Sequence, residues 1–191
     1  MKSISLLSIL LLLLFTSCRS TKPAAGTSSS GDTSPVHVTD SVPAQKDFSN
    51  PATWLIGYFD PGRLSQEPYS SWYIKGYEDY QYNTAAVNLL MDMNKTGISI
   101  KIVMGTWCSD SRREVPRFMK ILDLWQFPLS GVTFIGVDDA KRSPVGDYDK
   151  LDIQRVPTII IYKNNIEAGR IIENPVTSLE QDMVNILGRN E

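Results

Sequence analysis

The stretch of this chain best suited to chemistry is GTWCSDSRREVP, from Gly105 to Pro116, which contains Cys108 directly after Trp107. The chain has two cysteines, and the other one, Cys18, lies near the N-terminus. A second cysteine at position 111 would complete a Cys-x-x-Cys redox pair, but Ser111 stands there. The segment therefore offers a lone thiol rather than a dithiol.

The residues around Cys108 favour its thiolate, which is the nucleophilic form of a cysteine. A helix is predicted to begin at the next residue, so that its unpaired backbone N–H groups face the sulfur. Arg112 and Arg113 add positive charge, Asp110 opposes them, and Ser111 can donate a hydrogen bond from the place of the missing thiol. We therefore predict that Cys108 is the catalytic nucleophile and that Ser111 supports its thiolate.

A thiolate attacks a disulfide and forms a mixed disulfide, which a second thiol must then release. Ser111 cannot act as that second thiol, so a thiol from another molecule has to complete the cycle. This pattern permits isomerisation, deglutathionylation or trapping of a partner, and it disfavours autonomous two-electron reduction. The predicted partners are protein thiols or disulfides, or an extended peptide client.

Composition excludes several other classes of function. The chain has 191 residues with 42% hydrophobic content, enough for one ordinary domain, and its net charge of -2 does not indicate a nucleic-acid-binding protein. With His37 as the single histidine and two cysteines, no cluster has the spacing of zinc ligands. The adjacent Asp138 and Asp139 are interpreted as solvated turn residues. We predict neither a cofactor nor a bound metal.

Residues 1–17 are predicted to be a targeting signal. An apolar run, ISLLSILLLLLF, follows Lys2 and has the length of a signal-peptide core rather than that of a transmembrane helix. Its end, FTSC, resembles a bacterial lipoprotein signal, with Phe15 in the place of the usual leucine. That resemblance implies lipidation of Cys18, attachment to a membrane of the bacterial cell envelope and a domain outside the cytoplasm, in the periplasm. The alternative is an ordinary secretory signal with an incidental cysteine.

Two segments lie between this signal and the segment with Cys108. Residues 18–47 are rich in Ser, Thr, Pro, Ala and Gly, which predicts a flexible tether. Residues 48–83 are rich in tryptophan and tyrosine and are interrupted by three prolines, so we expect no long helix there. We interpret this segment as an N-terminal cap that completes the core, and the alternative is an aromatic surface that binds an extended peptide.

The remaining residues, 84–191, show an alternation of helices and strands. Hydrophobic spacing, capping residues and turn signals predict helices at 84–94, 109–127 and 179–187 and strands at 98–105, 131–138, 158–164 and 166–173. Asn164 and Asn165 predict a hairpin between the last two strands, and Ser178 with Gln181 forms a capping box before the last helix. This order predicts an α/β fold with a mixed central sheet and helices on both faces.

These elements and motifs resemble the thioredoxin-like superfamily. TWCSDS is similar to the Trp-Cys-x-x-Cys motif, and Pro116 matches the proline of the family's active-site helix. RVPTIIIYKNN is similar to the loop in which a cis-proline precedes a strand, so Val156, Pro157 and Thr158 take its place. The resemblance runs from about position 98 to 187. It implies a thioredoxin-like fold.

The resemblance also implies a substrate groove and a restricted chemistry. Pro157 is expected to be cis and to shape a groove beside Cys108, with Val156, Thr158 and Trp107 as further substrate-binding residues. Ile102 stands where the family has a buried aspartate that serves the second thiol. In this respect the chain resembles thioredoxin-like extracytoplasmic lipoproteins, in which a serine also replaces the second cysteine of the motif. Two functions stay open, a monothiol thiol–disulfide oxidoreductase or isomerase and a redox-inactive binding module for a protein or peptide.

Overall fold

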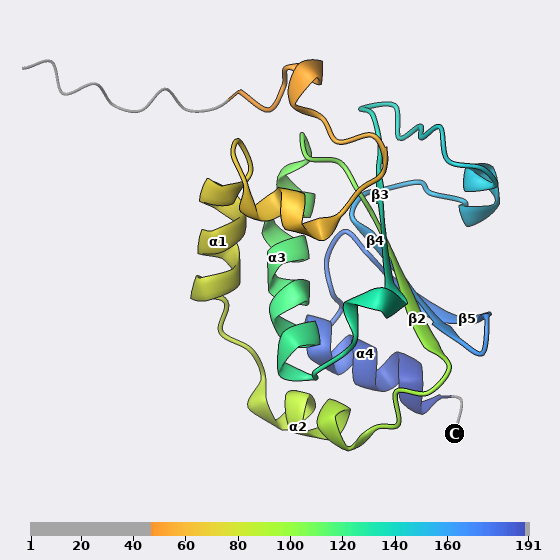
Figure 1. Ribbon diagram of the computed structural model, residues 1–191. Helices are drawn as coiled ribbons and strands as arrows, with labels where there is room; N and C mark the ends of the chain where they lie inside the picture. The colour runs from red at the N-terminus through yellow and green to blue at the C-terminus, as the bar shows by residue number, and fades with distance from the viewer. Residues whose placement is uncertain (1–46, 190–191) are drawn as a thin grey trace, which may run out of the picture. The chain divides into compact units, whose positions relative to one another are not determined.

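The central element of the computed structural model is a five-stranded mixed sheet with the strand order β1-β3-β2-β4-β5 (Figure 1), and the structure describes residues 47–189. The strands are β1 (Gly57–Tyr58), β2 (Ile98–Met104), β3 (Val132–Gly136), β4 (Thr158–Lys163) and β5 (Ile166–Ile172). The α-helices are α1 (Ser70–Asp79), α2 (Thr84–Asp92), α3 (Ser109–Leu124) and α4 (Leu179–Gly188). Short 3-10 turns occupy Pro51–Thr53, Pro61–Ser65, Leu129–Gly131 and Tyr148–Leu151.

The sheet is mixed because only one pair of its strands is connected by a crossover helix. β2 and β3 are parallel, and α3 returns the chain between them, whereas β4 pairs antiparallel with β2 and with β5. Asn164 and Asn165, the two residues that connect β4 to β5, have φ values of 54° and 63°. Asparagine tolerates this left-handed region, so the predicted hairpin is confirmed together with the α/β class.

All four helices lie on one side of the sheet, and α1 packs on the outside of α3. The alternate residues Ile98, Ile100, Ile102 and Met104 of β2 lie in one buried cluster with residues of α2, α3 and α4, and aromatic residues of α1 pack against it (Figure 1). The prediction of helices on both faces is therefore wrong. The physical reason is the polar segment between β3 and β4, which forms only the 3-10 turn Tyr148–Leu151 and gives the second face no α-helix.

The second face of the sheet carries a smaller buried cluster. It contains Val103, Ile135, Val137, Tyr148 and Val156, and Trp107 and Cys108 are half-buried against it. Tyr148 reaches this cluster from the loop between β3 and β4, and its hydroxyl donates a hydrogen bond to the carbonyl of Lys141 at 2.8 Å. This loop therefore covers the part of the second face that lies beside Cys108.

The aromatic segment 48–83 is built into the same core. Phe48, Phe59, Trp72, Tyr73, Tyr77 and Tyr80 are partly buried against the main cluster, which favours the interpretation of a cap. The segment also contains β1 and α1, which the sequence did not predict. Gly76 lets α1 approach α3 closely, because a Cβ at that position would lie 2.7 Å from the ring of Pro116.

Residues 1–46 lie outside the described part of the chain, and with them the predicted signal peptide, Cys18 and all but the last residue of the predicted tether. Within residues 47–189, no helix has the length and apolar character needed to cross a membrane.

Candidate functional site

Cys108 lies at the junction between β2 and α3, where it is the N-cap residue of the helix. Its side chain is half-buried, and its sulfur donates a hydrogen bond to the carbonyl oxygen of Val156 at 3.2 Å. Val156 comes from the loop before β4, 48 residues further along the chain. The fold therefore brings together Cys108 and the segment that the sequence predicted as its groove.

The loop that carries Cys108 is held by its own backbone and by Trp107. The Cys108 N–H donates to the carbonyl of Gly105 at 3.0 Å, and the Trp107 indole N–H donates to the carbonyl of Val137 at 3.0 Å. A Cβ on Gly105 would lie 2.5 Å from the Trp107 ring, so only glycine fits beneath the indole. Trp107 both packs against the second-face cluster and borders the thiol.

Ser111 does not contact the sulfur in the way that the sequence suggested. Its side chain is fully buried, and its hydroxyl oxygen accepts a hydrogen bond from the N–H of Gly105 at 3.3 Å. Among the described residues, no hydrogen bond links Ser111 to Cys108, and the α3 N–H groups make no capping bond to the cysteine side chain. In this structure Ser111 fixes the loop in front of Cys108.

The two arginines that follow Ser111 have different environments. Arg113 forms ion pairs with Asp110 at 2.7 Å and with Glu114 at 2.6 Å, so its charge is neutralised locally. Arg112 instead donates to the carbonyls of Thr106 at 3.1 Å and Trp107 at 2.8 Å. Burial lowers the pKa of Arg112, and the nearby Cys108 acts in the opposite direction. The Arg112 guanidinium therefore binds the two backbone carbonyls that directly precede Cys108 in the chain.

The loop before β4 has the predicted backbone geometry. The Val156–Pro157 peptide bond is cis, and the Pro157 carbonyl accepts a hydrogen bond from the N–H of Glu173 at 2.8 Å. Thr158 is buried, and its hydroxyl donates to the carbonyl of Arg155 at 2.6 Å, so it stabilises the loop from within. The part of this loop that contacts Cys108 directly is the Val156 carbonyl.

The other residues that the sequence singled out lie apart from this site. Ile102 is fully buried in the main cluster on β2, where a carboxylate would have no water. Asp138 accepts two hydrogen bonds from Arg142, at 2.7 Å from the backbone and 2.9 Å from the side chain, and these bonds lower the pKa of Asp138. Residues 47–189 contain no group of three or more side chains suited to a metal ion.

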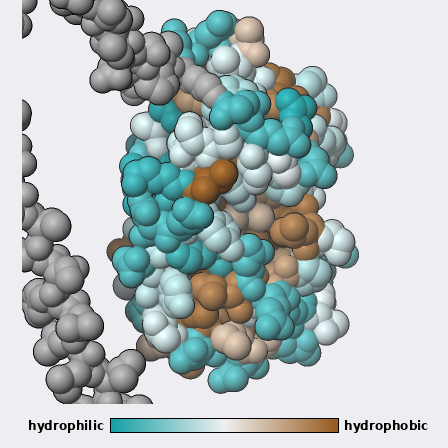
Figure 2. All heavy atoms as spheres, turned by 60° about the vertical axis from the view of Figure 1, so that its left-hand side comes forward, coloured by the Kyte–Doolittle hydropathy of each residue, from teal (hydrophilic) through white to brown (hydrophobic). Residues whose placement is uncertain are grey.

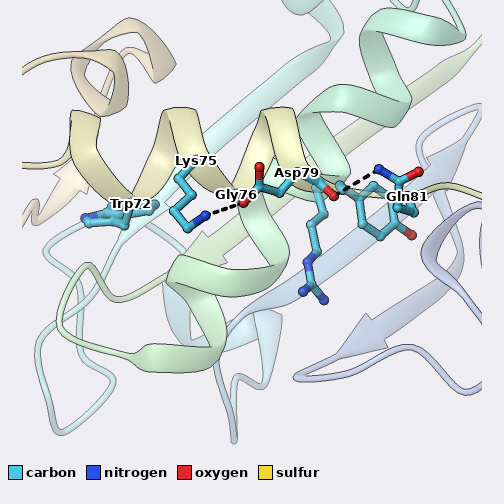
Figure 3. Close-up of a pocket in the computed structure, with 7 residues that line it drawn as sticks. Trp72, Lys75, Gly76, Asp79 and Gln81 are labelled. Atoms are coloured by element: carbon cyan, nitrogen blue, oxygen red, sulfur yellow. Dashed lines mark hydrogen bonds and ion pairs between the residues drawn. The ribbon is translucent and has the colours of Figure 1, made fainter.

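A groove with a volume of about 560 Å³ lies away from Cys108. It is lined by Trp72, Lys75, Gly76, Asp79, Tyr80, Gln81 and Arg117, most of which come from α1 (Figure 3). Lys75 forms an ion pair with Asp79 within the groove. Figure 2 shows the apolar side chains of the molecular surface as separate patches among polar ones. The groove contains none of the residues predicted to surround the thiol, but Trp72 and Tyr80 belong to the aromatic segment 48–83.

The sequence did not indicate that Thr106 belongs to this site, and it indicated Arg112 only as a nearby positive charge. Thr106 is 1% exposed, and its hydroxyl contacts the backbone of the aromatic segment. A buried threonine between a strand and a cysteine has no sequence signature of its own. Its role depends on contacts with residues more than 50 positions away.

Comparison with known proteins adds little to this geometry. No family model matches the chain, and no curated protein matches it. Among solved structures, the chain is similar to the 1.5 Å crystal structure of a protein of unknown function from Pseudomonas aeruginosa, with 13% identity and a TM-score of 0.41. That match covers 63% of this chain and 77% of the other one. At this level of similarity it carries no conclusion about fold family or function.

Proposed function

We propose that this chain is a thioredoxin-like protein in which Cys108 acts as a lone nucleophile in thiol–disulfide exchange. The observation that carries the proposal is the position of the thiol. Cys108 occupies the N-cap position of α3 and is half-buried, its carbonyl accepts the N–H of Arg112, and its sulfur lies 3.2 Å from the Val156 carbonyl of the loop before β4. Helix N-termini and nearby cations both stabilise a thiolate.

The arrangement of elements also supports the thioredoxin-like assignment. A parallel pair, β2 and β3, is joined by the helix that begins after the cysteine, and an antiparallel hairpin and a last helix complete the order. The cis bond before Pro157 lies next to the cysteine, as the resemblance implied. The second face lacks an α-helix between β3 and β4, so the proposal covers a reduced form of that fold.

The proposed reaction has two balanced steps. The Cys108 thiolate attacks one sulfur of a client disulfide, the Cys108–client S–S bond forms, and the second client sulfur leaves as a thiolate that takes a proton from water. A thiolate from the same client or from a small thiol then attacks the mixed disulfide and releases Cys108. The number of disulfides stays constant when the client's own thiolate attacks, which is isomerisation. When two external thiols supply the electrons, the client disulfide is reduced.

One observation favours the alternative of a redox-inactive binding module. The Cys108 sulfur lies 3.2 Å from the Val156 carbonyl in a hydrogen bond that a thiol can donate and the reactive thiolate cannot. In that case the loop before β4 and Trp107 would hold an extended client without turnover. The two functions differ in whether Cys108 reacts with a disulfide faster than an unfolded cysteine does.

The test uses an aromatic disulfide reagent on the full chain carrying Cys18→Ser, so that Cys108 is the remaining thiol. We expect release of one equivalent of aromatic thiolate, at a rate above that of the same chain unfolded in urea. The protein should keep the reagent as a stable adduct, because no resolving thiol is present. Cys108→Ser should release none. If the folded chain reacts no faster than the unfolded one, the proposal is contradicted, and the redox-inactive binding module is the remaining function.

The proposal includes an envelope location, which is supported by the likeness of residues 1–18 to a lipoprotein signal. If Cys18 carries the lipid, the wild-type protein expressed in a bacterial host should partition into the detergent phase. Cys18→Ser should move it to the aqueous phase, and equal partitioning of the two proteins would contradict the anchor.

A further inference from the structure

We infer that residues 48–55 form a strap that positions the loop from Gly105 to Cys108, with Thr106 as the positioning residue. This inference rests on the proposed thiol chemistry of Cys108. The strap lies at the start of the aromatic segment, just before β1, and Figure 1 draws this part of the chain in orange. It gives part of the aromatic segment a role beyond completing the core.

Thr106 connects the strap to the reactive loop through both functions of its hydroxyl. The hydroxyl donates a hydrogen bond to the carbonyl of Thr53 at 3.2 Å and accepts one from the N–H of Leu55 at 3.3 Å. Two backbone groups of the strap are therefore satisfied by one side chain that lies two positions before Cys108. Because the site is 1% exposed, water cannot easily replace either bond.

Further hydrogen bonds hold the strap in place. The indole N–H of Trp54 donates to the carbonyl of Phe48 at 2.9 Å, and the Tyr69 hydroxyl donates to the same Thr53 carbonyl at 2.9 Å. A Cβ on Gly136 would lie 2.0 Å from the carbonyl oxygen of Leu55, so the strap passes directly against β3. The strap therefore provides a fixed surface rather than a loose cover.

Aromatic side chains of the strap reach the residues on both sides of the thiol. The rings of Trp54 and Trp107 have centroids 6.2 Å apart, and the guanidinium of Arg112 lies 4.9 Å from the ring centre of Phe48. Arg112 in turn binds the carbonyls of Thr106 and Trp107. Strap, arginine and loop thus form one connected set of contacts around Cys108.

This set of contacts fixes the position of Cys108 relative to α3 and to Val156. A site of this kind depends on supporting contacts that keep its reactive atom within about 0.5 Å of the productive position. Removing the Thr106 hydroxyl leaves the Leu55 N–H without its partner and releases the loop from the strap. We expect the sulfur then to spend less time at the N-terminus of α3, and its exchange with a disulfide to become slower.

The experiment measures the second-order rate of Cys108 with the aromatic disulfide reagent in the full chain carrying Cys18→Ser. Thr106→Val keeps the shape of the side chain and removes its hydroxyl, whereas Thr106→Ser keeps the hydroxyl. We expect the rate of Thr106→Val to fall at least about fivefold, because the variant loses both hydrogen bonds of the hydroxyl and one ordinary bond alone corresponds to about that change, and we expect Thr106→Ser to restore the rate. Tyr80→Phe is the control, because it removes a partly buried hydrogen bond to Glu180 away from the thiol.

Each outcome of this experiment decides the inference. A wild-type rate in Thr106→Val, or an equal loss in Tyr80→Phe, would overturn it. If the parent chain itself reacts no faster than an unfolded cysteine, the proposed function fails first, and the strap has no reaction to position. Should circular dichroism show that Thr106→Val is unfolded, Trp54→Ala takes its place. That variant removes the ring contact with Trp107, and an unchanged rate in it would likewise overturn the inference.

Discussion

Replacing Ser111 by cysteine is expected to double the release of aromatic thiolate from the Cys18→Ser chain, from one equivalent to two. The first equivalent leaves when Cys108 attacks the reagent. The introduced thiol then attacks the Cys108 adduct, an intramolecular disulfide forms between positions 108 and 111, and the second equivalent leaves. The reaction needs no further oxidant, because the reagent disulfide accepts both electrons.

The physical basis of this expectation is the register of α3. Positions three apart at a helix start have Cβ atoms about 5–6 Å apart, which small rotations bring to disulfide geometry. The Ser111 hydroxyl lies beneath the loop and contacts the Gly105 N–H at 3.3 Å, so the introduced thiol starts on the loop side of α3. The lone-thiol behaviour of this chain would then depend on a single side chain.

The control for this variant is Ser109→Cys, which places a second thiol on the exposed residue that directly follows Cys108. That chain should also release two equivalents, but mass spectrometry should find two adducts on it. Ser111→Cys should instead lose two hydrogen atoms and carry no adduct. A persistent single adduct on Ser111→Cys would show that position 111 does not face the thiol, and would contradict the geometry of the site.

Glu180→Ala is expected to lower the free energy of unfolding by about 2 kcal/mol, because it removes a fully buried side chain that accepts hydrogen bonds from two partly buried donors. Glu180 is 0% exposed and lies in the first turn of α4. Its carboxylate accepts a hydrogen bond from the Tyr80 hydroxyl at 2.8 Å and another from the N–H of Asn83. Glu180 thereby ties the end of the aromatic segment to the last helix, about 100 residues away along the chain.

Urea unfolding of the full chain, followed by circular dichroism, measures this change. The midpoint should fall while the slope with denaturant concentration stays constant, as for a change in stability alone. Asp79→Ala is the matched control, because Asp79 is an exposed carboxylate near the end of the same segment that pairs with Lys75. It should change the free energy by less than about 1 kcal/mol. Equal effects of the two variants would contradict a buried, structural role for Glu180.

The effect of Glu180→Ala also bears on the boundary between the aromatic segment and the rest of the chain. Tyr80 and Asn83 belong to residues 48–83, which the sequence treats as a separate cap, and Glu180 belongs to residues 84–191. Because one buried carboxylate serves both, we expect the two parts to unfold in a single transition. Two resolved transitions in the same urea experiment would show that the cap unfolds independently.

The local pattern of the sequence determined most elements from position 84 onward. Asn83 accepts the N–H of Ala86 and starts α2, and Ser178 accepts the N–H of Gln181 and starts α4, as their side chains allow. The β-branched run of β2 and the paired asparagines of the hairpin likewise depend on neighbours in sequence. The position of Cys108 at the start of a helix also followed from the sequence alone.

The tertiary structure decided the contacts between distant segments. β1 has two residues and pairs with β3 through Gly57 and Gly136, so no periodic pattern could reveal it. The distribution of helices over the two faces was decided by how the elements pack, because the polar segment between β3 and β4 forms only a short turn, as its composition indicated, and all four α-helices collect on the other side.

The tertiary structure also decided which residues surround the Cys108 thiol. The sequence supplied Cys108, Ser111 and the Val156–Thr158 segment, but it assigned the Ser111 hydroxyl to the sulfur rather than to the Gly105 N–H. Thr106 and the strap contact each other across more than 50 residues, and only the packed chain brings them together. The sequence thus determined which group can react, and long-range packing decided what holds that group in place, because hydrogen bonds between distant segments leave no local pattern in the chain.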